Sequence, residues 1–216
     1  MNLAAALRGF GAPGIAAIVL IALIGNVIVG PMIVIPAGAL LVLLWARLSR
    51  TPLSEIGYVR PRSATLVIAA AFGIALKFAM KSLVMPALGA DPINRTYHFL
   101  AGNRALLPTA ILAMCIVGFS EETVFRGFAF ERLGKLLPSK IAIVLLTSLW
   151  FGVAHYSGQG VAGVQQGAIV GLALGTIYAA SGEIWTVMLA HATFDLTALA
   201  MIYWNVESAI AHLVFK

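Results

Sequence analysis

Continuous apolar segments recur from one end of this 216-residue chain to the other, and they limit its possible folds more than any other feature. Only 10% of the residues are charged, whereas a soluble domain typically has about 25%. The apolar segments are continuous, which excludes the alternating strands of a transmembrane barrel. Because lipid cannot satisfy backbone hydrogen bonds, the sequence predicts an all-α, polytopic membrane helical bundle.

The apolar segments predict about seven transmembrane helices, within a range of about six to eight. Only short polar or basic loops separate them, so we expect a single integral membrane domain over residues 1–216. Its motif-bearing core covers about residues 106–204. The predicted spans are residues 13–29, 32–46, 64–85, 106–130, 141–155, 161–180 and 184–204.

The formal net charge of +6 comes from basic residues that are scattered among the loops instead of gathered in one patch. This distribution is typical of topology signals in membrane proteins, so we exclude nucleic-acid binding and expect a cytoplasmic N-terminus. No small-residue cleavage site closes the first apolar segment, which predicts an uncleaved first span. The lone Cys115 excludes a disulfide framework and a cysteine-based metal site.

Lys77 and Lys81 lie four residues apart in the third predicted span and therefore on one helical face. One explanation is that their long side chains snorkel to the membrane interface. The functional alternative is a cationic contact for a substrate carboxylate or a lipid headgroup. Glu183 precedes the last predicted span and Glu207 follows it, so we expect both at the interface.

The stretch FSEETVFRGF places three ionisable groups inside the fourth predicted span. An uncompensated charge at mid-bilayer costs roughly 2.5–3.5 kcal/mol, so such groups face the interior of a bundle and usually mark function. Glu122 and Arg126 are four residues apart and are predicted to form an ion pair. Glu121 is rotated by about 100° from that pair. It is therefore free to act as a general base that activates water.

Two further pairs of residues place polar side chains in the spans. Phe151 and His155 are one helical turn apart at the end of the fifth span, and His191 and Asp195 share a face of the seventh. Taken alone, His155 is typical of an interfacial residue, and an interior polar pair can simply join helices. Counted from the span ends, Glu121, His155 and His191 fall within about 10 Å of a common depth, which allows them to meet.

Three motifs in this order resemble those of the glutamate-type CAAX prenyl endopeptidases and their bacterial relatives, the CPBP or ABI family of intramembrane proteases. The motifs are E-E-x-x-x-R at Glu121–Arg126, F-x-x-x-H at Phe151–His155 and H-x-x-x-D at His191–Asp195. Each motif is short, and the three together in membrane helices are more specific. The resemblance covers about residues 111–197.

The resemblance implies a helical bundle around a polar intramembrane cavity that opens towards the cytoplasm. It implies that Glu121 and His155 activate a water molecule to attack a peptide carbonyl, and that His191 and Asp195 line the site of the oxyanion. The supporting residues would be Glu122, Arg126 and Phe151.

The resemblance also implies an intramembrane endopeptidase that cuts near a substrate C-terminus or the membrane boundary. We expect no cofactor. The expected partners are membrane lipids and a peptide or membrane-protein substrate, with or without a lipid modification. The expected location is a bacterial-type inner membrane, with several passes. The prenyl-protein branch has asparagine where this chain has Asp195. An ionised carboxylate only accepts hydrogen bonds, so we expect Asp195 to fix the tautomer of His191, whose imidazole would then donate.

Two alternatives use the same residues differently. A zinc-dependent intramembrane protease would use Glu121, His155, His191 and Asp195 as metal ligands, and these are acceptable ligand types, although H-E-x-x-H is absent. A non-catalytic transporter, immunity protein or scaffold would use its polar groups only to join helices.

Overall fold

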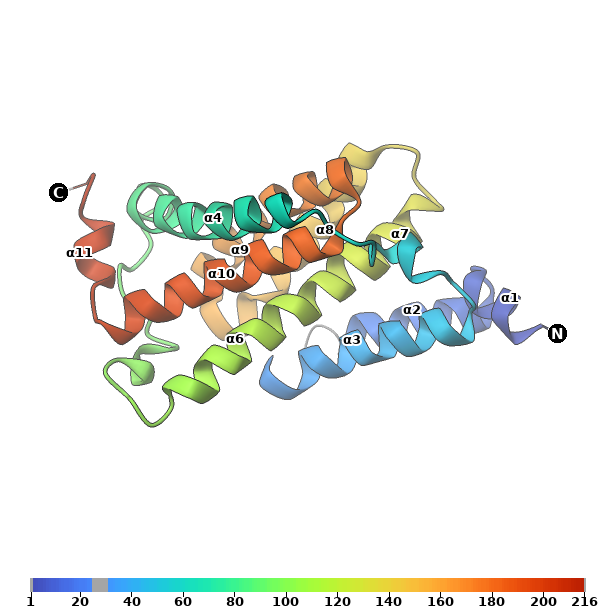
Figure 1. Cartoon of the computed structure of the whole chain (residues 1–216), viewed down its shortest axis with the longest axis horizontal. Coiled ribbons are helices and arrows are strands. Elements are labelled where there is room, and N and C mark those ends of the chain that lie inside the picture. The colour runs from blue at the N-terminus through green and yellow to red at the C-terminus, as the bar shows by residue number, and fades with distance from the viewer. Residues whose placement is uncertain (1, 25–30, 216) are drawn as a thin grey trace.

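The computed structural model describes residues 2–24 and 31–215, and every regular element in these two ranges is helical. Figure 1 shows an elongated bundle with the N-terminus and the C-terminus at opposite ends. Two short 3₁₀ turns, η1 and η3, and two π-helical turns, η2 and η4, lie among the α-helices. The elements are α1 (Leu3–Arg8), α2 (Ala12–Ile24), α3 (Pro31–Leu48), η1 (Leu53–Ile56), α4 (Ser63–Ala79), η2 (Met80–Val84), α5 (Met85–Ala87), η3 (His98–Leu100), α6 (Leu107–Glu122), η4 (Thr123–Phe128), α7 (Ala129–Gly134), α8 (Lys140–Ala154), α9 (Tyr156–Ser181), α10 (Ile184–Tyr203) and α11 (Glu207–Ala211).

The described helices include several that are suited to a membrane, and the protein is an integral membrane protein. Four stretches are long and apolar enough to cross one: Ser63–Ala87, Leu107–Gly134, Tyr156–Ser181 and Ile184–Tyr203. Three shorter apolar helices are Ala12–Ile24, Pro36–Leu48 and Lys140–Ala154. These seven segments overlap the seven predicted spans, but crossing by all seven stays a prediction. Residues 25–29 of the first predicted span lie outside the described residues.

Helix α10 runs between α4 and α6, and small residues let these helices approach closely (Figure 1). Gly73 of α4 lies against the carbonyl of Ala190 and the hydroxyl of Thr193. Gly118 of α6 faces the backbone of Ala192, where an added Cβ would come 3.0 Å from the Ala192 nitrogen. His191 lies between these contacts in sequence. The close packing therefore brings the third motif next to the first.

Helix α9 packs against α8 through glycines spaced four residues apart. An added Cβ at Gly167 would come within 3.2 Å of the His155 ring nitrogen Nδ1, and one at Gly171 within 3.0 Å of the Ser148 Cα. Gly152 of α8 faces α9 from the other side. This seam holds the second motif, at the end of α8, against the middle of the bundle.

Two local irregularities occur at the motifs. The chain leaves α6 through the π-helical turn η4, which contains Arg126, and such turns are frequent at functional sites. His155 lies between α8 and α9, and five residues later Gly160 has φ +61° and ψ −152°. That conformation is essentially restricted to glycine, and it divides α9 into two helical pieces. The predicted start of the sixth span, at residue 161, coincides with this break.

Gly73→Ala is expected to lower the free energy of unfolding by about 1–3 kcal/mol, because the new Cβ overlaps the backbone of α10. Denaturant titration of the purified protein in mixed micelles measures this change. Gly158→Ala is the matched control, since an added Cβ there has no atom within 4 Å and alanine favours a helix. Equal destabilisation by the two substitutions would contradict the close α4–α10 contact.

Candidate active site

Glu122 lies at the centre of a fully buried polar cluster. Its Oε1 is 2.8 Å from Nη1 of Arg126 and 2.8 Å from Nδ1 of His191. The ion pair with Arg126 that the four-residue spacing predicts is therefore confirmed. The contact with His191 joins the first motif to the third across 69 positions of sequence.

Arg126 links three helical segments. Its guanidinium donates from Nη2 to the carbonyl of Gly171 on α9, at 3.1 Å, and lies 4.7 Å from the centroid of the Phe151 ring on α8. A planar guanidinium can serve a carboxylate, a carbonyl and an aromatic face at the same time, which lysine cannot do as well. Arg126 is thus placed to hold Glu122 and Phe151 in a fixed relation.

Glu121 is also buried, with 5% of its surface exposed, and it points into the same cluster. Its Oε2 is 3.6 Å from Nε2 of His191, which is too long for a good hydrogen bond. Among the residues that the structure describes, this oxygen has no hydrogen-bond partner. A buried carboxylate oxygen without a protein donor calls for a water molecule or a substrate group.

The two ring nitrogens of His191 face different partners. Nδ1 is bonded to Glu122, whereas Nε2 faces Oε2 of Glu121 and Oδ2 of Asp195, both at 3.6 Å. The expectation that Asp195 fixes the tautomer of His191 is therefore wrong in this geometry. Glu122 accepts the Nδ1 proton at hydrogen-bond distance, and Asp195 lies with Glu121 on the opposite side of the ring.

His155 is oriented by the backbone of its own motif. Its Nδ1 lies 2.8 Å from the carbonyl of Phe151, which can only accept, so Nδ1 carries the proton and Nε2 is left as an acceptor in the neutral ring. The Phe151 ring packs edge-on against His155, with centroids 4.7 Å apart, and against His191 at 5.7 Å. Phe151 thus connects the second motif with the third.

Lys77 and Lys81 are buried inside the bundle, so the snorkelling interpretation is wrong. Lys81 forms an ion pair of 2.8 Å with Glu207, which is also buried. The expected position of Glu207 at the membrane interface stays a prediction. The partners are 126 residues apart, and the sequence held no signal for their contact. The sequence indicated only that Lys77 and Lys81 share a helical face. In the structure this face points into the bundle.

The described residues contain no cluster of potential metal ligands. Among residues 2–24 and 31–215, no group of three or more His, Cys, Asp and Glu side chains is arranged to hold a metal ion.

Residues 103–197 match the family described as type II CAAX prenyl endopeptidase, Rce1-like. This part of the chain is similar to the CAAX protease family. The matched CAAX protease segment contains all three motifs and the complete polar cluster, and its family supports an intramembrane protease. No curated protein and no solved structure gave a match to the chain. Lys77, Lys81 and Glu207 lie outside the CAAX protease segment.

Proposed function

We propose that this CAAX protease is a glutamate-dependent intramembrane endopeptidase that cuts near a substrate C-terminus or the membrane boundary. The observation that carries the proposal is Oε2 of Glu121, a buried carboxylate oxygen with no donor among the described residues, 3.6 Å from Nε2 of His191. A water molecule beside this oxygen would be polarised by a base and by a neighbouring imidazole.

In the proposed reaction, Glu121 removes a proton from the water as the water oxygen attacks the peptide carbonyl. The acceptor nitrogen of His155 is a second contact for the same water. The carbonyl oxygen becomes an oxyanion, which His191 stabilises when Nε2 carries a proton. The tetrahedral intermediate then collapses, and the proton held by Glu121 passes to the leaving amine as the C–N bond breaks.

The remaining polar residues position these groups. Glu122 holds His191 through Nδ1, and Arg126 neutralises Glu122, so that Glu121 stays outside the ion pair. Asp195 faces the same nitrogen of His191 as Glu121 and is proposed to border the oxyanion side of the site.

Comparing the membrane proteomes of cells that carry the wild-type protein or Glu121→Gln tests this function. The proposal expects at least one new protein terminus that is present with the wild type and missing with the variant. Equal amounts of folded protein in the membrane are the control. Identical termini in the two samples would favour the alternative of a non-catalytic membrane protein.

Treatment of the purified protein with a strong chelator is expected to leave peptide cleavage unchanged, because a carboxylate base accepts a proton without help from a metal. The rate of cleavage before and after chelation, followed by dialysis, measures this. Lasting inhibition that added zinc reverses would instead favour the zinc-dependent alternative.

A further inference from the structure

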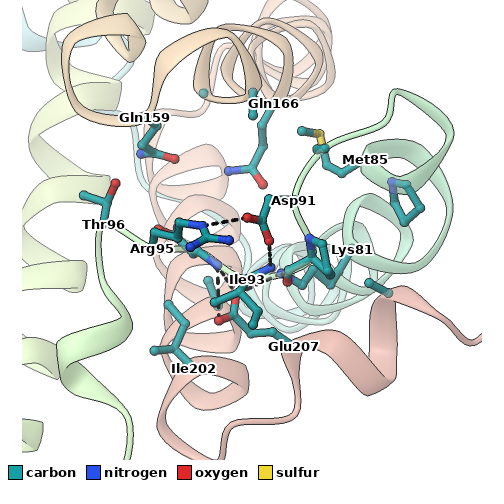
Figure 2. A pocket seen from close by; sticks show the side chains of 18 of the residues that line it. Lys81, Met85, Asp91, Ile93, Arg95, Thr96, Gln159, Gln166, Ile202 and Glu207 are labelled. Atoms are coloured by element: carbon teal, nitrogen blue, oxygen red, sulfur yellow. Dashed lines mark hydrogen bonds and ion pairs between the residues drawn. The ribbon is translucent and has the colours of Figure 1, made fainter.

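A cavity of about 260 Å³ lies beside the polar cluster, at the end of the bundle that carries the C-terminal helix. Its walls come from the end of α4 with η2, from the loop before η3, from the first half of α9, and from α10 and α11. Figure 2 shows Gln159 and Gln166 of α9 on one side, with Asp91 and Arg95 of the loop facing them.

The cavity borders the candidate active site on two sides. Gly163 of α9 lines it, and an added Cβ at Gly163 would be 3.4 Å from the Cβ of His155. Ala198 of α10 also lines it, one helical turn beyond Asp195. Two residues that line the cavity are therefore direct neighbours of His155 and Asp195.

Lys77 is a buried cation in the cavity wall, with 7% of its surface exposed. Its ammonium donates to Oε1 of Gln166 at 3.2 Å and lies 4.7 Å from the centroid of the Phe194 ring. Within the described parts of the chain it forms no ion pair, whereas Lys81 is bonded to Glu207 and to a backbone carbonyl. An ammonium has three donors, so Lys77 keeps capacity for an anionic partner.

The side chains that line the cavity carry a small net positive charge, which favours an anion. Three of its lining side chains are cations, and two are carboxylates. The N–H of Ile93 and the Arg95 guanidinium hold the pKa of Asp91 below its usual value, so this carboxylate stays ionised at neutral pH. The net charge of the wall is thus +1, from Lys77, Lys81, Asp91, Arg95 and Glu207.

We propose that Lys77 and Gln166 bind the free C-terminal carboxylate of the peptide that is cut, an inference that depends on the proposed endopeptidase function. The Lys77 ammonium supplies the charge. The amide nitrogen of Gln166 supplies a second donor, because its Oε1 already accepts from Lys77. The cavity then selects substrates that end in a free carboxylate.

Paired peptides that differ only in a C-terminal acid or amide test this proposal. The probe is the last dozen residues of a substrate found by the proteome comparison, or otherwise a mixed-sequence peptide pool. Binding of each peptide is measured with the Glu121→Gln variant in neutral nanodiscs. The acid is expected to bind about 10- to 100-fold more tightly than the amide, as for a hydrogen bond to a charged group. Adding Lys77→Met should remove this preference, Lys77→Arg should retain most of it, and the surface control Lys140→Met should leave it unchanged.

The same pairs are then cut by the wild-type protein, where the acid should show the higher kcat/KM. Equal binding of acid and amide, or an acid preference that survives Lys77→Met, would overturn the carboxylate site. An acid preference that anionic lipid abolishes would assign Lys77 to a headgroup phosphate and overturn it as well. Selective acid binding without cleavage of either peptide would contradict the endopeptidase function alone.

Discussion

Arg126→Met is expected to lower the free energy of unfolding by about 3–5 kcal/mol, because it leaves the fully buried carboxylate of Glu122 without its cation. Methionine fills a similar space but cannot donate to Glu122 or to the carbonyl of Gly171. The remaining partner of that carboxylate, His191, has its own carboxylate neighbours on the other side of the ring. Reversible denaturant titration in mixed micelles measures the change.

Two further variants make this measurement specific. Arg95 also pairs with a carboxylate four residues away, Asp91, but this pair is exposed. Arg95→Met should therefore leave the free energy of unfolding almost unchanged. Combining Arg126→Met with Glu122→Gln removes both buried charges, and it is expected to be less destabilising than Arg126→Met alone. Equal effects of Arg126→Met and Arg95→Met would show that the buried pair contributes little.

Local spacing predicts the parts of this site that lie on one helix. Glu122 and Arg126 are adjacent on a helical face in any bundle, so their pairing follows from the sequence. The helical segments themselves follow from apolar length, because the backbone in lipid has few other options. The order of the three motifs was sufficient to indicate the CAAX protease family, and a model of that family matches residues 103–197.

Contacts between distant segments could not be predicted in the same way. The partner of His191 is Glu122, and not the neighbouring Asp195, because the close approach of α6 and α10 at Gly118 sets which carboxylate reaches Nδ1. The inward direction of Lys77 and Lys81 depends on the rotation of α4 within the bundle. A single sequence gives the faces of a helix but not which face meets which neighbour.

Two expectations concern which side of the membrane each end of the bundle faces, and they cannot both hold for the cavity described above. The resemblance implied a cavity that opens towards the cytoplasm, and the distribution of basic residues predicted a cytoplasmic N-terminus. The cavity lies at the end of the bundle with α11, whereas the N-terminus lies at the opposite end (Figure 1). With the N-terminus in the cytoplasm, this cavity would open on the other side of the membrane.

Glu121→Gln is expected to reduce the cleavage rate by about 10²- to 10⁴-fold, the range for loss of a general base. Glutamine keeps the size and the hydrogen-bonding oxygen of the side chain but cannot accept the proton of the attacking water. The fold should be preserved, because Oε2 of Glu121 has no protein hydrogen bond to lose among the described residues. Glu55→Gln, at an exposed surface position, is the matched control and should cut at the wild-type rate.

The single-turnover rate on a substrate from the proteome comparison tests the central claim most directly. Wild type, Glu121→Gln and Glu55→Gln are compared at equal amounts of folded protein in the same nanodiscs. The account predicts a loss of at least about 10²-fold that is confined to Glu121→Gln. A rate near that of the wild type in this variant would contradict the role of Glu121 as the base.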